Sequence, residues 1–188
     1  MENNTKKFQE VFNQKYRGNQ NTFGSIPLPV VTKTLEYIST GDALDLGVGN
    51  GRNTLFLLSE SFNVTGVDSS EEGIKILKEK VGDNPNLEII LSDVMEYEPT
   101  KQYDLILAVG LLHFLKEEDG LKLTKRIQDW TKEGGINVIG AKMRQNIANN
   151  LPHVFKHDEL KGYYKRKNWD VKFYEERGAS FLIAQKLY

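Results

Sequence analysis

The chain has 188 residues, no cysteine, and 25 basic against 26 acidic residues, which leaves a formal net charge of −1. This length suits one domain with a sizeable core, and the balanced charge favours small-molecule chemistry over a nucleic-acid or membrane partner. The lack of cysteine excludes disulfides and thiolate nucleophiles. No apolar run of about 18 residues occurs, and no hydrophobic stretch follows the polar first residues, so we expect a cytoplasmic protein.

The first 40 residues read as a helical segment that precedes the core. The pattern predicts a helix over 7–16, a loop rich in Gly, Asn and Pro over 17–29, and a second helix over 30–39. We expect residues 1–40 to lie over the ends of the strands as a lid.

The central part, residues 41–141, alternates between short Val/Ile/Leu-rich runs and amphipathic stretches. Such runs are typical of buried parallel strands, and the alternation predicts an open, doubly wound α/β sheet with a Rossmann-like order. The predicted strands cover residues 43–46, 63–67, 87–91, 103–109 and 135–141. The predicted helices cover residues 51–60, 70–81 and 117–132, the last ended by a glycine pair.

The C-terminal part, residues 142–188, changes character. After a predicted helix over 157–166, residues 169–174 and 179–188 form two strand-like runs separated by a short polar turn. Two strands joined by a tight turn pair antiparallel. We therefore expect one domain with a mostly parallel sheet that is closed by an antiparallel C-terminal strand.

A glycine loop follows the first core strand, with the sequence DLGVGNG at 45–51. Glycine tolerates positive φ and has no Cβ, so a ligand can approach the backbone closely. A dinucleotide fingerprint would need its third glycine at position 52, where this chain has Arg52. Asp45 beside the loop would repel a pyrophosphate and attract a sulfonium group. The pattern therefore favours S-adenosylmethionine over NAD.

Polar residues at the next strand ends complete a predicted cofactor site, because ligands of doubly wound sheets bind at the carboxyl ends of the strands. Asp68 is expected to bind the ribose hydroxyls. Asp93 is expected to accept from the adenine amino group while Val94 packs on the ring, although a turn cap explains Asp93 equally well. The predicted cofactor-binding residues are Asp45, Gly47, Val48, Gly49, Arg52, Asn53, Asp68, Ser69, Asp93, Val94 and Val109.

These features resemble the class I S-adenosylmethionine-dependent methyltransferases. The resemblance spans about residues 40 to 141 and rests on DLGVGNG at 45–51, Asp68, SDV at 92–94, YDLIL at 103–107 and KEGG at 132–135. It implies a seven-stranded sheet whose last strand is antiparallel, with Asp68 on the ribose and the glycine loop on the methionine portion. The family's DNA-modifying members carry an Asn/Asp-Pro-Pro-aromatic tetrapeptide after the fourth strand, which this chain lacks, so base methylation is disfavoured.

A narrower similarity is to the TehB-type tellurite-resistance methyltransferases. It rests on KY at 15–16, GNGRN at 49–53, FL at 114–115 and FKHDELKGYY at 155–164. The chain passes from Tyr174-Glu175-Glu176-Arg177 directly into the last strand, without the longer insert bearing His and Arg that we associate with that subfamily's substrate site. The resemblance therefore does not carry the substrate over.

Two residues are candidates for the chemistry of methyl transfer, which needs alignment in a dry site and a base only for a protonated acceptor. His113 follows the fourth strand and is a candidate base or orienting group. Tyr16 is a candidate to close over the cofactor from the lid. A packed structural histidine and a plain lid tyrosine are the alternatives.

Neither a metal site nor an anion site is strongly indicated. His153 and His157 have the spacing of a helical metal pair, but Pro152 argues against one helix carrying both, so we expect no metal. Lys142, Arg144 and Arg177 lie near strand ends, where they are candidates to attract an anionic substrate or are ordinary surface charges.

The sequence therefore predicts an enzyme that transfers a methyl group from S-adenosylmethionine to a small acceptor, such as a chalcogen oxyanion or a thiol-like compound. A non-catalytic S-adenosylmethionine sensor is the alternative from another class. An NAD-dependent oxidoreductase is a third reading, weakened by Arg52 and Asp45. No pattern indicates an oligomeric state.

Overall fold

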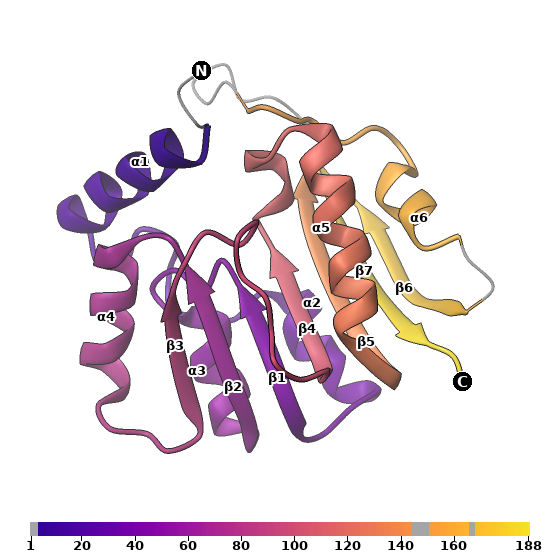
Figure 1. Cartoon of the computed structure of the whole chain (residues 1–188), viewed down its shortest axis with the longest axis horizontal. Coiled ribbons are helices and arrows are strands. Elements are labelled where there is room, and N and C mark those ends of the chain that lie inside the picture. Colours follow the sequence, from indigo (N-terminus) through magenta and orange to yellow (C-terminus); the bar gives the residue numbers. More distant parts are fainter. Residues whose placement is uncertain (1–3, 144–150, 166–167) are drawn as a thin grey trace.

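The computed structural model describes residues 4–143, 151–165 and 168–188. Its centre is a seven-stranded sheet in the order β3-β2-β1-β4-β5-β7-β6 (Figure 1). Only β7 is antiparallel to its neighbours, with β5 on one side and β6 on the other. The strands are β1 Gly41–Leu46, β2 Phe62–Asp68, β3 Leu87–Leu91, β4 Tyr103–Val109, β5 Thr131–Lys142, β6 Trp169–Glu176 and β7 Ala179–Lys186.

Helices cover both faces of this sheet, and α1 lies across its carboxyl edge beside the start of α4 (Figure 1). The helices are α1 Asn4–Gly18, α2 Pro29–Thr32, η1 Lys33–Glu36, α3 Arg52–Ser59, α4 Glu71–Val81, η2 Leu112–Phe114, α5 Glu117–Trp130 and α6 Glu159–Tyr163. Within the described ranges, no helix is long and apolar enough to cross a membrane.

Two hydrophobic cores form because successive side chains of a strand point to opposite faces. In β1, Leu44 and Leu46 join the core that contains residues of α5 and α6. Ala43, which directly precedes Leu44, points to the opposite face and joins the other core, with residues of α2 and α3. Strands buried on both faces explain the nearly continuous apolar runs in the sequence.

The doubly wound sheet with an antiparallel β7 confirms the expected fold. One boundary is wrong: the predicted helix 117–132 ends at Trp130, and β5 begins at Thr131 instead of residue 135. Thr131 already pairs with Tyr103, and the register shifts before Ile136 pairs with Leu105. Gly134, with φ of 76°, therefore lies in a bulge of the strand and does not end the helix.

Two predicted helices are shorter in the structure. The helix expected over 30–39 is divided into α2 and η1, in keeping with the low helix propensity of its β-branched residues Val30, Val31 and Thr32. The helix expected over 157–166 begins only at Glu159, because Asp158 has a left-handed backbone with φ of 56°. The end of that predicted range, at residue 166, lies outside the described residues.

Candidate cofactor and acceptor site

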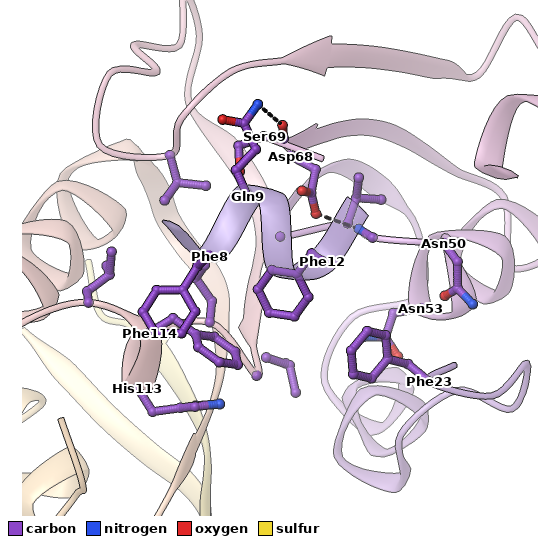
Figure 2. A pocket seen from close by; sticks show the side chains of 18 of the residues that line it. Phe8, Gln9, Phe12, Phe23, Asn50, Asn53, Asp68, Ser69, His113 and Phe114 are labelled. Atoms are coloured by element: carbon purple, nitrogen blue, oxygen red, sulfur yellow. Dashed lines mark hydrogen bonds between the residues drawn. The ribbon is translucent and has the colours of Figure 1, made fainter. Parts of the chain in front are cut away.

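A cavity of about 330 Å³ lies where the carboxyl ends of the central strands meet α1 (Figure 2). Every predicted cofactor-binding or catalytic residue except Asp45 lies in its wall. The lining residues are Phe8, Gln9, Phe12, Tyr16, Phe23, Gly47, Val48, Gly49, Asn50, Arg52, Asn53, Asp68, Ser69, Asp93, Val94, Val109, Gly110, Leu111, His113, Phe114, Leu115 and Lys142.

The glycine loop is held against the end of β2 by backbone hydrogen bonds. The N–H groups of Gly47 and Val48 both donate to the Val67 carbonyl, at 2.8 and 3.1 Å. Gly49 has a φ of 55°, and its N–H donates to Oδ2 of Asp68 at 2.8 Å. The loop therefore presents bare backbone to the cavity, as close binding of a ligand requires.

Asp68 joins the loop to the start of α4. Its Oδ1 accepts from the Ser70 N–H at 2.7 Å while Oδ2 accepts from Gly49. Burial raises the pKa of Asp68, and the N–H donors of Ser70, Gly49 and Ser69 oppose that rise. Each carboxylate oxygen has a second lone pair, so the group still has capacity to accept from two hydroxyls.

Tyr16 lies directly over the glycine loop. It is buried, and a Cβ placed on Gly49 would come within 2.3 Å of its hydroxyl oxygen. Burial and the nearby charge of Asp68 raise the pKa of Tyr16, while a hydrogen bond with the Asn50 backbone opposes the rise. The phenol is therefore neutral and has a proton to donate.

Side-chain contacts fasten α1 to the residues that follow Asp68. Nε2 of Gln9 donates to the Ser69 carbonyl at 2.9 Å (Figure 2). Oδ1 of Asn13 accepts from the Ser70 hydroxyl at 2.7 Å, and Arg17 pairs with Glu72 at 2.9 Å. The helix expected to act as a lid therefore forms one wall of the cavity.

Arg52 and Asn53 line the cavity, but their polar atoms also hold the loop before α2. Arg52 donates to the Phe23 carbonyl at 2.6 Å, and Oδ1 of Asn53 accepts from the Leu28 N–H at 3.2 Å. The neighbouring Asn50 donates to the Gln20 carbonyl at 3.1 Å. These side chains position the N-terminal segment over the glycine loop.

Asp45 is not in the cavity wall. Its side chain is buried, and its Oδ2 accepts from the Thr54 hydroxyl of α3 at 2.7 Å. Burial raises the pKa of Asp45 to about 6, although the hydrogen bond from Thr54 lowers it in part. The spacing in the sequence put Asp45 near the loop but did not reveal that its carboxyl group faces α3.

Asp93 caps a turn and also lies in the cavity wall, while its contact with adenine stays a prediction. Its Oδ1 accepts from the Met95 N–H at 2.9 Å, which is a turn cap, and the residue also lines the cavity. Val94 beside it is buried, and Val109 lies in the same wall.

His113 lies in the part of the wall opposite the ribose-side residues, on η2 (Figure 2). It is 2% exposed, and its Nδ1 accepts from the Lys142 backbone N–H at 3.4 Å. Burial lowers the pKa of His113 to about 3, and the nearby positive charges of Lys142 and His153 contribute smaller decreases. The ring is therefore neutral, and with Nδ1 accepting, the proton belongs on Nε2.

Four phenylalanines in the wall were not predicted. Phe12 meets Phe114 edge-on at 4.9 Å between ring centroids, and Phe8 lies 5.1 Å from Phe114. Phe23 extends the group, 6.0 Å from Phe12. The sequence carried a signal for part of this set, since Phe8, Phe12 and Tyr16 recur every four residues on one face of α1.

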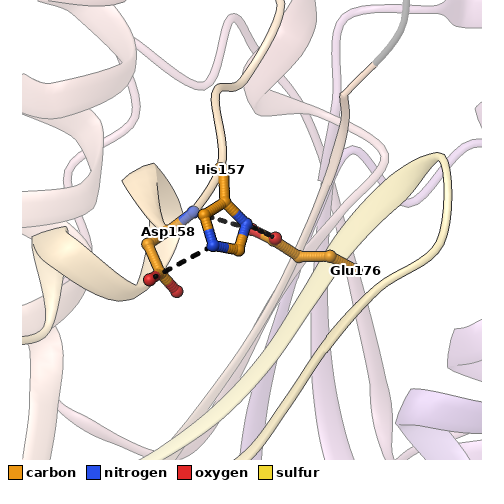
Figure 3. A group of neighbouring side chains, drawn as sticks. All are labelled: His157, Asp158 and Glu176. Carbon is orange, nitrogen blue, oxygen red and sulfur yellow. Dashed lines mark hydrogen bonds and ion pairs between the residues drawn. The ribbon is translucent and has the colours of Figure 1, made fainter.

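The two histidines with metal-pair spacing do not converge. His153 pairs with Glu159 at 2.8 Å, and His157 pairs with Glu176 (Figure 3). Ligand atoms of His157, Asp158 and Glu176 lie within 4.8 Å of one another, but Glu176 already accepts from the Asp158 N–H and the Tyr174 hydroxyl. This group joins α6 to β6, and the absence of a metal stays a prediction.

Of the two described basic residues considered for anions, Lys142 lies in the cavity wall and Arg177 does not. Arg177 is exposed and pairs with Glu175 at 2.8 Å. Arg144 lies outside the described residues.

The strand order, the glycine loop and an acidic residue at the end of β2 together define the class I S-adenosylmethionine-dependent methyltransferase fold. The chain belongs to the TehB family: residues 6–182 match the family described as "Tellurite resistance protein TehB". The family and the cofactor class predicted from the sequence are thereby confirmed, which leaves no support for the NAD reading.

Individual relatives agree with this assignment. A probable S-adenosyl-L-methionine-dependent methyltransferase TehB from Haemophilus influenzae strain 10810 is 35% identical over 150 residues, which is 78% of this chain and 52% of the relative. The chain thus spans about half the length of the curated TehB relatives that it matches.

Solved structures show the same fold. The crystal structure of TehB from Haemophilus influenzae has a TM-score of 0.76 at 27% identity, over 95% of this chain and 66% of that one. The 1,6-didemethyltoxoflavin-N1-methyltransferase of Burkholderia thailandensis has a TM-score of 0.77 at 19% identity, over 96% of this chain and 88% of that one.

Proposed function

We propose that this chain transfers the methyl group of S-adenosylmethionine to a small-molecule acceptor. The observation that carries the proposal is one continuous cavity whose two ends have different chemistry. The glycine loop and the acids after β2 and β3 suit a nucleoside donor, and His113, Lys142 and Phe114 form a separate end suited to an acceptor. The family membership supports the same donor.

The donor end fits S-adenosylmethionine in its chemistry. Asp68 offers carboxylate lone pairs for ribose hydroxyls, Asp93 and Val94 suit adenine, and the bare backbone of Gly47 and Gly49 in the cavity wall suits the methionine portion. The neutral Tyr16 hydroxyl is positioned to donate to a carboxylate there. When bound, the cofactor supplies an electrophilic methyl group on a sulfonium.

The acceptor end favours a small acceptor that carries lone pairs. His113 presents a neutral N–H, and Lys142 lines the same wall. The rings of Phe8, Phe12 and Phe114 exclude water, which favours in-line transfer. Because ligand pockets range over about 300–1,000 Å³ and this one must hold donor and acceptor together, the acceptor has few atoms. A chalcogen oxyanion or a thiol-like compound meets these conditions.

Calorimetry with S-adenosylmethionine, S-adenosylhomocysteine and NAD tests the donor. We expect the two sulfur nucleosides to bind and NAD not to bind. Tight binding of NAD alone would contradict the proposal.

Release of S-adenosylhomocysteine over a panel of selenite, tellurite, thiols and small phenols tests the transfer. We expect turnover with at least one of these acceptors. Binding of the donor without turnover on any of them would favour the sensor reading.

A further inference from the structure

The order of the strands separates the acceptor end of the cavity from its two acids. Asp68 ends β2 and Asp93 follows β3 on one side of β1, whereas His113 follows β4 and Lys142 ends β5 on the other side. His113 and Lys142 both line the cavity, and the Lys142 ammonium is near enough to the His113 ring to lower its pKa. The cation and the imidazole therefore share one end of the cavity, away from the carboxylates.

Among the described residues, no side chain at this end is suited to take up a proton. Nδ1 of His113 accepts from the Lys142 backbone N–H, so the proton of this neutral ring is on Nε2. Lys142 is a cation, and burial raises the pKa of Tyr16, which keeps that phenol protonated. An acceptor that must lose a proton would meet no base here, whereas an acceptor that arrives as an anion needs none.

Hydrogen-bond donors are few at this end. The backbone N–H groups of Gly110, Phe114 and Leu115 already donate to backbone carbonyls, at 2.8, 3.0 and 3.1 Å. In the described wall beyond β4, the side-chain donors are Nε2 of His113 and the ammonium of Lys142. Such a pair matches an anion whose charge is on one atom, whereas an oxyanion such as selenite spreads its charge over several oxygens that each accept hydrogen bonds.

Aromatic rings surround these two donors. The Phe114 ring lies 4.2 Å from the His113 ring between centroids, and Phe12 and Phe8 lie 4.9 and 5.1 Å from Phe114. Sulfur is polarisable and packs favourably against aromatic rings, but the rings offer nothing that replaces the water around a hard oxyanion. The aromatic wall therefore favours a soft anion.

We propose that the methyl acceptor is a thiolate whose sulfur binds to the Nε2–H of His113 and the ammonium of Lys142, with the rings of Phe12 and Phe114 beside it. The inference rests on the proposed methyl transfer and narrows its acceptor to a thiol that has ionised before it reacts. Lys142 is then a binding residue that stabilises the anion, and the transfer uses no base from the protein.

The step balances without a further reactant. A lone pair of the thiolate sulfur forms the bond to the methyl carbon, and the electron pair of the breaking methyl–sulfur bond stays on the donor sulfur. No proton moves, and the negative charge of the thiolate and the positive charge of the sulfonium both disappear. Because charge is lost in this step, a wall of aromatic rings that excludes water favours it.

Without a base, the acidity of the acceptor itself decides which compounds react. A cysteine-like thiol ionises near pH 8.5 and a tyrosine-like phenol near pH 10, so thiols supply more anion at neutral pH than phenols do. The proposal therefore ranks thiols above phenols and alcohols of the same shape.

The pH dependence of kcat/KM for two thiols tests whether the protein supplies a base. Ethanethiol and 2,2,2-trifluoroethanethiol are similar in size, but the fluorinated thiol is more acidic. We expect kcat/KM to rise with pH up to the pKa of each thiol, so that the two acidic limbs differ as the two pKa values do. An acidic limb at one common pH for both thiols would assign the proton to a group of the protein and overturn the proposal.

The variant Lys142→Met tests the cation. We expect kcat/KM for 2,2,2-trifluoroethanethiol to fall about 10-fold or more, as is typical when a hydrogen bond to a charged group is lost. Affinity for S-adenosylmethionine, measured by calorimetry, should change less than about twofold. The matched control is Lys156→Met, which removes the same charge from an exposed lysine next to Phe155, whose N–H donates to the Lys142 carbonyl. Equal losses in both variants would reduce the effect to net charge and contradict the role of Lys142.

A binding measurement does not depend on turnover. The chain has no cysteine, so the ultraviolet absorbance of a thiolate belongs to the added ligand alone. With S-adenosylhomocysteine present, we expect benzenethiol to bind as its anion, with an apparent pKa about 1 unit or more below that of the free thiol. Lys142→Met should abolish this decrease, and Lys156→Met should keep it. Benzenethiol that binds without a decrease in its pKa would overturn the proposal.

Selenite tests the preference for a soft anion. We expect its kcat/KM to lie at least about 10-fold below that of the ionised 2,2,2-trifluoroethanethiol. A higher kcat/KM for selenite would overturn the thiolate proposal and leave methyl transfer intact. Failure of methyl transfer itself would show separately, as absent donor binding or as no release of S-adenosylhomocysteine with any acceptor.

Discussion

Asp68 links three parts of the molecule through one carboxylate: the glycine loop, the start of α4 and the cavity. Its two oxygens accept from the N–H groups of Gly49 and Ser70. The carboxylate is thus positioned by the backbone before any ligand arrives, and such preorganisation lowers the cost of binding.

We expect Asp68→Asn to raise the Kd for S-adenosylmethionine about 10- to 100-fold. Hydrogen bonds to a charged group contribute about 1.5–3 kcal/mol, and the amide NH₂ opposes one of the backbone donors. Calorimetry measures the change, with Asp83→Asn on an exposed loop as control. An unchanged affinity would remove Asp68 from the site.

Asp45 makes the folded state sensitive to pH. Its folded pKa of about 6 lies above the ordinary 3.8, so the fold prefers the protonated carboxyl group. The protonated Asp45 therefore contributes its full stabilisation below the ordinary pKa of 3.8, and this stabilisation is lost as the pH rises toward 6. At about 1.4 kcal/mol per factor of ten, the ionised carboxylate costs on the order of 3 kcal/mol above that pH.

Asp45→Asn should remove this dependence, because the amide oxygen can still accept from Thr54. The free energy of unfolding of the variant, relative to the unmodified protein, should increase by about 3 kcal/mol between pH 4 and pH 7. Urea titrations across this range measure it. Asp68, whose pKa is also raised, is present in both proteins, so its own burial cancels and only its repulsion with Asp45 enters the difference. A difference that stays constant with pH would refute the account.

At the scale of elements, the contact between α1 and the glycine loop decides the shape of the cavity. Tyr16 leaves no room for a side chain at Gly49, and its ring also lies 3.0 Å from a Cβ placed on Gly73. The loop and α4 therefore both need glycine where α1 packs on them.

Gly49→Ala should destabilise the protein by about 1–3 kcal/mol and weaken donor binding, because the methyl group would overlap the Tyr16 hydroxyl. Adding Tyr16→Phe removes the hydroxyl, so it should recover the destabilisation that comes from the overlap. It should not recover the cost of about 1–2 kcal/mol for holding an alanine in the left-handed backbone conformation. Denaturant unfolding of both single variants and the double variant measures the coupling.

Gly178→Ala is the matched control, since Gly178 has a φ of 76° but nothing within 4 Å of a Cβ. It isolates the backbone cost from the overlap. If the free-energy changes of Gly49→Ala and Tyr16→Phe simply add in the double variant, the two positions are not coupled. The Tyr16 hydroxyl would then not be the group that the new methyl group overlaps.

At the scale of the whole molecule, the sheet and the N-terminal segment contribute differently. Among the described side chains of α1, none belongs to either hydrophobic core, whereas Phe8, Phe12 and Tyr16 all line the cavity. The sheet with its covering helices holds the fold, and α1 completes the site.

Removing residues 1–18 should therefore leave a cooperatively unfolding protein whose affinity for S-adenosylmethionine falls at least about 10-fold, as expected when several hydrogen-bonding and aromatic contacts are lost together. Circular dichroism and calorimetry on the shortened chain measure the two properties. Loss of cooperative unfolding would show that α1 belongs to the core.

Much of this architecture was predictable from local patterns. Strand periodicity, the glycines of the loop and the acids after β2 and β3 act over a few residues, so they can be recognised in the sequence. The bulge at Gly134 could not be recognised, because a glycine pair after a helix looks the same as a helix end until the pairing with β4 is known.

The sequence by itself determined the doubly wound sheet, the class of donor and most of the residues that line the cavity, since backbone conformation and strand order follow from short-range patterns. Only the tertiary structure decided that Asp45 faces Thr54, that His113 is neutral and that aromatic rings of α1 line the cavity. These properties depend on burial and on contacts between segments far apart in the chain. Desolvation and packing act only after the chain has folded, so the burial and protonation of these side chains follow from the fold, whereas the glycine loop can be recognised in the sequence.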